Sequence, residues 1–181
     1  FFKQKTAYEI RLSLVGSEGT TGLQGDYTFH FLKALARAQG ADYEEVLRRS
    51  VCVSADVNAA LDPTFPDVHD PRNAARMNCG VCLTKYTGAR GKGATNDASA
   101  ETLSYVTNVF DEANVAWQTG ELGKVDQGGG GTIAKFVSNR NVDTVDIGVP
   151  MLSMHAPFEL VAKQDVLMTY RAFLAFATAR Q

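Results

Sequence analysis

The sequence predicts an α/β fold in which helices cover the faces of a sheet. Short segments rich in β-branched residues alternate with single helix-like segments, the order expected of strands joined by helices. Apolar residues make up 45% of the chain and charged residues 21%, which is the composition of a globular domain. The 181 residues are enough for one domain to bury a core, and we find no internal repeat or long linker.

The first expected elements are two helices and a strand. Asp26 is placed to cap a helix over 27–39. Helical spacing puts four apolar side chains on one face of that helix, namely Phe31, Leu32, Leu35 and Ala38. A shorter helix over 43–49 leads into a β-branched strand that ends at Asp56.

The middle of the chain predicts one strand and one helix, separated by loops. A loop rich in proline and aspartate covers 57–73, and the next strand covers 77–86. Glycines favour a loop over 87–97, before a helix over 99–113. Helical spacing indicates that this helix buries Leu103, Val106 and Phe110.

The last third predicts two strands and two helices. A strand over 115–119 is followed by a second glycine-rich loop over 120–131 and a helix over 132–139. A strand over 142–149 precedes the final helix, over 158–179. One stripe of that helix carries Val166, Tyr170, Phe173 and Ala177. Ligand sites of such sheets collect at strand ends, so we expect the chemistry there.

The charge balance argues against nucleic-acid and membrane partners. The chain has 18 basic and 20 acidic residues, a net charge of −2, and lacks the basic excess of proteins that bind anionic surfaces. No apolar run approaches the ~20 residues that a membrane span needs. The first residues do not resemble a secretory signal. Three cysteines are too few for a disulfide framework, which favours a cytoplasmic location.

Two residues at expected strand ends are candidate metal ligands. Asp56 opens an acidic segment that also holds Asp62, Asp67, His69 and Asp70. Carboxylates and imidazoles are ligands that zinc prefers, although aspartate beside proline is also ordinary turn chemistry. His155 follows the strand over 142–149 in a small apolar run, where a lone histidine has a structural role more often than a ligand role.

Two further motifs allow several interpretations. Cys79 and Cys82 have the spacing of a redox or zinc pair, but on a strand their side chains point to opposite faces, so we interpret both as core-filling residues. The four glycines over 128–131 precede Thr132. They favour an anion site at a helix start, a flexible loop, or a glycine wall that a peptide backbone can approach closely.

Taken together, the chain resembles the C-terminal part of the aminopeptidase I / aspartyl aminopeptidase family of cocatalytic zinc exopeptidases. The resemblance rests on the blocks GSEGTTGLQGDY (16–27), SADVNAALDPTFPD (54–67), KYTGARGKGATNDAS (85–99), and GGGGTIAKF with VPMLSMHAPFE (128–159). It is closer to the bacterial aminopeptidase I branch, because the second block reads DPTFPD. The resemblance implies part of a three-layer α/β/α zinc-exopeptidase domain with a mixed sheet.

The family implies a site with two zinc ions, where metal-activated water attacks the first peptide bond and a glutamate acts as general base. Of the five protein groups that hold the metals, two can be placed here: Asp56 matches the aspartate of the SAD block and His155 the histidine of the SMH block. They are expected to bind different zinc ions. Ser13 and Leu14 stand where the family has a glutamate pair, so the general-base position holds a serine.

The resemblance also indicates a pocket for the first residue of a peptide substrate, with Tyr86, Gly129, Gly130 and Thr132 as candidates. Tyr86 is equally consistent with a packing role at a strand end. Residues 1–15 look like a translated sequencing adapter and are expected to be a non-native leader, with 16–181 forming the C-terminal part of the catalytic domain.

Three functions follow as hypotheses. The first is a fragment of a zinc aminopeptidase, inactive by itself because one ligand per zinc cannot hold the metal, and belonging to a homo-oligomer that is a dodecamer in the family. The second is a non-catalytic binding or assembly module on the same fold. The third is a phosphate or nucleotide binder that uses the loop Gly128–Gly131 with Lys124 or Lys135.

Overall fold

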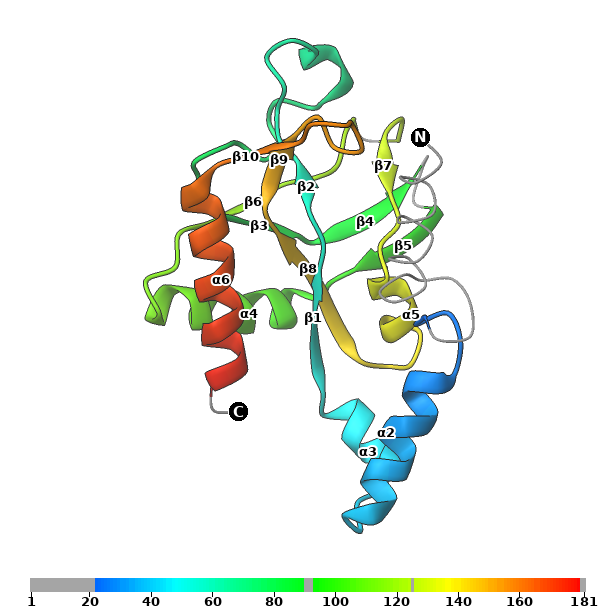
Figure 1. Ribbon diagram of the computed structural model, residues 1–181. Coiled ribbons are helices and arrows are strands. Elements are labelled where there is room, and N and C mark those ends of the chain that lie inside the picture. Colours follow the sequence, from blue (N-terminus) through cyan, green and yellow to red (C-terminus); the bar gives the residue numbers. More distant parts are fainter. Residues whose placement is uncertain (1–21, 90–92, 125, 180–181) are drawn as a thin grey trace. The chain divides into compact units, whose positions relative to one another are not determined.

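The computed structural model describes residues 22–89, 93–124 and 126–179 (Figure 1). Its contacts divide the chain into two units, one formed by residues 1–52 and 133–143 and the other by residues 53–132 and 144–181. The predicted leader over 1–15, including Ser13 and Leu14, lies outside the described residues. No helix in the described ranges is both long and apolar enough to cross a bilayer.

The described part of the first unit contains three helices, namely α2 (Tyr27–Ala38), α3 (Tyr43–Arg48) and α5 (Ala134–Ser138). The predicted apolar face of α2 is wrong. Phe31 is 61% and Leu35 44% exposed, and Ala38 is also exposed, whereas Phe29 and Ala36 are buried. The guanidinium of Arg140 lies 4.5 Å from the centre of the Phe29 ring and pairs with the Asp26 carboxylate. The contact surface of α2 is therefore set by a segment far along the chain.

The same ion pair changes the expected role of Asp26. Asp26 occupies the N-cap position of α2, but its side chain makes no capping hydrogen bond. Its carboxylate accepts a hydrogen bond from Arg140 instead. The predicted helix start is correct, and the predicted capping contact is wrong because a long-range partner holds the carboxylate.

The second unit is built on a four-stranded sheet with the order β1-β8-β3-β6. The strands are β1 (Val51–Ala55), β8 (Asp143–Gly148), β3 (Val81–Thr84) and β6 (Trp117–Thr119). Strand β3 runs parallel to β6 and antiparallel to β8. The sheet is therefore mixed, and the predicted α/β class is confirmed.

Two helices complete the core of this unit. Helices α4 (Ala100–Glu112) and α6 (Lys163–Thr178) pack against each other, and α6 also packs against β3. Their buried side chains join those of β3 and β8 in one cluster, which includes Val81, Leu83, Val106, Phe110, Val145, Ile147, Met168 and Ala172. The predicted buried face of α4 is confirmed, with Leu103 packed at the edge of the cluster.

The predicted stripe of α6 is partly wrong. Phe173 packs against the core cluster as expected, but Ala177 is exposed. Val166 and Tyr170 are 45% and 63% exposed, and the helix buries Asp165, Met168, Thr169 and Ala172 instead. The Asp165 carboxylate accepts hydrogen bonds from the backbone N–H groups of Asn78 and Gly80, at 2.7 and 2.8 Å. A buried aspartate that holds the turn before β3 thus fixes the rotation of the helix, which apolar spacing alone does not predict.

All three loops predicted from glycine, proline and aspartate contain strands. Strands β4 (Tyr86–Ala89) and β5 (Gly93–Asp97) form an antiparallel hairpin, and β7 (Gly129–Gly130) pairs with β4. Strands β2 (Asn58–Ala59), β9 (Pro150–Leu152) and β10 (Leu160–Val161) form a second small sheet, and a 3-10 turn covers Pro66–Val68. Glycine-rich strands carry too few side chains to show the period of two.

Other predictions differ in detail. The strand over 77–86 begins only at Val81, and the final helix only at Lys163. Cys82 is fully buried, as expected of a core-filling residue, but Cys79 lies before the strand and is exposed. The interpretation of Cys79 is therefore wrong, because it is not a strand residue.

Candidate active site

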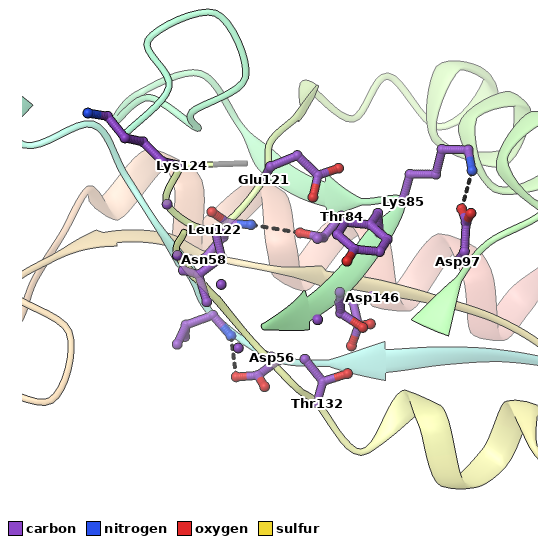
Figure 2. Close-up of a pocket in the computed structure, with 18 of the residues that line it drawn as sticks. Asp56, Asn58, Thr84, Lys85, Asp97, Glu121, Leu122, Lys124, Thr132 and Asp146 are labelled. Carbon is purple, nitrogen blue, oxygen red and sulfur yellow. Dashed lines mark hydrogen bonds and ion pairs between the residues drawn. The ribbon is translucent and has the colours of Figure 1, made fainter. Parts of the chain in front are cut away.

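A cavity of about 320 Å³ lies in the second unit, where β1, β3 and β8 meet the two glycine-rich segments (Figure 2). This volume is at the lower end of the range for small-molecule sites. Five of the residues singled out from the sequence line it: Asp56, Tyr86, Gly129, Gly130 and Thr132. The fold therefore brings one expected metal ligand and all four substrate candidates into one place.

Asp56 lies directly after β1, and the pairing of the sheet fixes its backbone. Its N–H donates to the carbonyl of Ile147 at 3.1 Å, and its Oδ1 accepts the N–H of Val57 at 2.8 Å. Although the residue as a whole is exposed, desolvation of the carboxyl group raises the pKa of Asp56, against the opposing effects of the Val57 N–H and the positive charge of His155.

His155 lies in a turn three residues after β9. Its φ angle is 68°, and its N–H donates to Oε1 of Glu159 at 2.8 Å. Strand β9 pairs in parallel with β2, so that Asn58 lies opposite Pro150. This pairing brings the segments around Asp56 and His155 together although they are far apart in the sequence. His155 is exposed and is not among the residues that line the cavity.

The two side chains fit zinc in kind but not in number. A carboxylate and an imidazole are common zinc ligands, and a zinc site has three or four protein ligands. Within the described residues, no group of three histidine, cysteine, aspartate or glutamate side chains is arranged to hold a metal ion. Further ligands are needed to complete a site at Asp56 and His155.

Asp146 is a cavity residue that the sequence reading missed. It lies on β8, where alternation points Val145 and Ile147 into the core and Asp146 to the opposite face. Asp146 is only 3% exposed, and among the described residues neither carboxylate oxygen has a hydrogen bond of good geometry. Burial raises its pKa to about 6, opposed by the nearby hydroxyls of Ser54 and Thr132 and reinforced by the charge of Asp56. The sequence feature that could have identified Asp146 is an aspartate within an otherwise apolar strand.

The variant Asp146→Asn is expected to make the chain more stable at pH 8 but not at pH 4. The raised pKa means that the folded state binds more protons than the unfolded state, so stability falls as the pH rises from about 4 to 6. Removing the charge should recover on the order of 2 kcal/mol at pH 8. Urea unfolding of the two chains in a chelator at both pH values measures this. An equal or lower stability of the variant at pH 8 would contradict it.

Glu121 is a second cavity residue that the sequence did not indicate. It follows β6 and Gly120, and its N–H donates to the carbonyl of Asn73 at 2.6 Å. Burial and, to a smaller extent, the charge of Asp97 raise the pKa of Glu121 to about 7, against the opposing effects of Lys85 and the Tyr86 N–H. A single glutamate between glycine and leucine carries no signal that separates it from a surface residue.

The glycine loop forms one wall of the cavity through close backbone packing. Gly88 and Gly130 are opposite each other in the β4–β7 pair. A Cβ atom at Gly130 would lie 3.1 Å from a methyl group of Leu122, and one at Gly128 would lie 3.0 Å from the Lys124 nitrogen. The interpretation as a glycine wall therefore fits better than a flexible loop.

The anion-site interpretation gains no support from this loop. Helix α5, which follows it, has only five residues. The Lys135 ammonium lies over the Phe136 ring at 4.7 Å, and Lys124 extends away from the other labelled residues of the cavity (Figure 2). The phosphate or nucleotide hypothesis is therefore not favoured.

Comparisons with known proteins agree with the resemblance. Residues 13–177 match the family model described as aminopeptidase I zinc metalloprotease (M18). A probable M18 family aminopeptidase 1 of Thermotoga maritima is 47% identical over 164 residues, which cover 88% of this chain and 36% of that protein. The chain thus spans little more than a third of the length of the curated relatives it matches.

Solved structures give the same picture. The crystal structure of the M18 aminopeptidase from Thermotoga maritima matches with a TM-score of 0.84 and 46% identity, over 91% of this chain and 38% of that one. Aminopeptidase I from Clostridium acetobutylicum matches with a TM-score of 0.84 and 40% identity, over 91% and 36%. A Saccharomyces cerevisiae structure described as a dodecamer is 22% identical, with a TM-score of 0.71 over 90% and 35%, and shares the fold.

Proposed function

This chain belongs to the aminopeptidase I zinc metalloprotease (M18) family, and from this premise we propose that it is part of an enzyme that removes N-terminal residues from peptides. The observation that supports the proposal most directly is geometric. Asp56 lines one cavity together with all four expected substrate residues, and the pairing of β2 with β9 brings the segment of His155 beside that of Asp56. Asp56 and His155 are far apart in the sequence, and no structural role of either residue requires their segments to lie side by side.

Asp56 and His155 would each hold one of two zinc ions. Bound zinc would supply a water molecule with lowered pKa and a Lewis acid that polarises the peptide carbonyl. The chain's own contribution is orientation. Hydrogen bonds to Ile147 and Val57 fix Asp56, and the backbone bond to Glu159 fixes the turn that carries His155.

The substrate would lie along the glycine wall. Gly129 and Gly130 expose backbone rather than side chains to the cavity, so that a peptide main chain can approach closely. Tyr86 and Thr132 would border the position of the first residue. The enzyme would work in the cytoplasm, which the low cysteine count favours, and as a homo-oligomer, which the family resemblance implies.

The 181-residue chain by itself is expected to show no aminopeptidase activity. Two donors, one for each metal, are fewer than the three or four of a zinc site, and Ser13 occupies the general-base position. Release of 4-nitroaniline from leucine 4-nitroanilide with added zinc measures this. Turnover by the chain that a chelator abolishes would contradict the expectation.

A hybrid enzyme tests the proposed function itself. In this hybrid, residues 22–179 of the chain replace the aligned segment of the Thermotoga maritima relative, which supplies everything else. We expect chelator-sensitive hydrolysis of amino-acyl anilides. A folded, zinc-loaded hybrid without hydrolysis would overturn the proposed function and favour the hypothesis of a binding module.

A further inference from the structure

The walls of the cavity in Figure 2 suit an unbranched apolar chain. Val57 and Leu122 line it together with Tyr86, and a volume of about 320 Å³ has room for one amino-acid side chain. Apolar walls of this kind gain free energy by burying methylene groups. The cavity therefore fits a long side chain, and its charged groups decide which end group that side chain carries.

Carboxyl groups dominate the charge of this cavity. Among the described residues, two lysines line it, against four carboxyl groups besides the expected zinc ligand Asp56, namely Asp97, Glu121, Asp126 and Asp146. The Lys85 ammonium is already paired with the Asp97 carboxylate. Lys124 is exposed, and Figure 2 shows its side chain directed away from the other labelled residues. Neither lysine is therefore available to an acidic ligand.

Glu121 is a carboxylate of this cavity that forms an ion pair with neither lysine. Its side chain is directed toward Thr84 and Lys85, into the group of lining residues (Figure 2). In the described part of the chain, no lysine, arginine or histidine forms an ion pair with it. The Lys85 ammonium lies in the same cavity but is paired with the Asp97 carboxylate and not with Glu121.

Asp146 is a second carboxylate that lines this cavity, and it is only 3% exposed. Neither of its oxygens has a well-formed hydrogen bond among the described residues, although the hydroxyls of Ser54 and Thr132 are nearby. Buried acceptors without well-formed hydrogen bonds are costly, and a ligand that brings N–H groups removes that cost. A cationic ligand therefore suits both carboxylates.

We propose that Glu121 makes this cavity selective for peptides whose first residue has a cationic side chain, such as lysine. The methylene groups of that side chain would pack between Leu122 and Val57, and its ammonium would pair with the Glu121 carboxylate. This inference rests on the proposed aminopeptidase function and adds the substrate class. Glu121 would act as a specificity-determining residue and take no part in bond cleavage.

A comparison of lysine and norleucine substrates measures the contribution of the contact between the ammonium and Glu121. The two side chains have the same four-carbon chain, and only lysine ends in an ammonium, while the α-amine is common to both. In the zinc-loaded hybrid, kcat/KM for lysine 4-nitroanilide is expected to exceed that for norleucine 4-nitroanilide by about tenfold, the size of one partly exposed ionic contact. In Glu121→Gln the ratio of the two values should fall to about one.

The outcomes separate this inference from the proposed function. Asp67→Asn removes the same charge from the exposed 3-10 turn and should leave the ratio as it was. Hydrolysis of both substrates with a ratio that Glu121→Gln does not change would overturn the inference and leave the function standing. This is also the result expected if Glu121 binds the α-amine.

If the hybrid hydrolyses neither substrate, binding of lysinamide and norleucinamide to the 181-residue chain tests the inference. Chemical shifts of the ¹⁵N-labelled chain would be followed during titration with lysinamide and norleucinamide. Tighter binding of lysinamide at resonances of the cavity, lost in Glu121→Gln, would support the inference. Equal binding of both amides would overturn it.

Discussion

Asp56→Asn and His155→Ala are each expected to lower hydrolysis by the hybrid enzyme by more than about 100-fold. Loss of a hydrogen-bond partner outside the ligand shell already costs 10–100-fold in metal affinity or activity, and loss of a ligand must cost more. Each variant should also lose zinc, because the neutral amide of asparagine is a weaker ligand than carboxylate, and alanine is none. The measurements are kcat/KM with an amino-acyl anilide and the zinc content after dialysis.

Matched controls show whether the loss is specific to these positions. Asp62→Asn changes an aspartate of the same segment whose Oδ1 accepts the Thr64 N–H in a local turn. His30→Ala removes an exposed histidine of α2. Both controls should stay within about twofold of the hybrid, because surface substitutions of this kind have small effects. If Asp56→Asn or His155→Ala keeps its zinc and most of its activity, the proposed metal site is wrong.

Gly148→Ala is expected to destabilise the chain by more than about 3 kcal/mol or to prevent folding. A Cβ atom at this position would lie 1.2 Å from the carbonyl oxygen of Asp56 and 2.4 Å from its carbonyl carbon. These are backbone atoms, so no side-chain rotation relieves the overlap. The end of β8 and the residue after β1 would have to separate, and Asp56 would leave its position. Urea unfolding followed by circular dichroism measures the effect.

The control for this variant is Gly40→Ala. Gly40 has a φ angle of 68°, and a Cβ atom added there would have no neighbour within 4 Å. Only the cost of the left-handed conformation applies there, about 1–2 kcal/mol. A midpoint for Gly148→Ala equal to or above that of Gly40→Ala would show that the close approach of β8 to Asp56 is not required for folding.

Local sequence patterns predict the long helices, the strands of the central sheet and the blocks that carry the chemistry, but not the short strands in the loops. Helix α4 and strand β8 lie within two residues of their predicted bounds, because apolar spacing and β-branched runs are local properties. Asp56 was identified because a strand ends there and because the surrounding block resembles a known family. Such signals are complete within a few consecutive residues, so they can be read without coordinates.

Tertiary structure alone decided which faces are buried and what fills the cavity. Phe29 is buried because Arg140 lies over it, and α6 turns Asp165 inward because backbone N–H groups at Asn78 and Gly80 need an acceptor. Glu121 and Asp146 meet in the cavity only through pairing between strands distant in the sequence. Contacts of this kind depend on partners far along the chain, and a local pattern does not contain them.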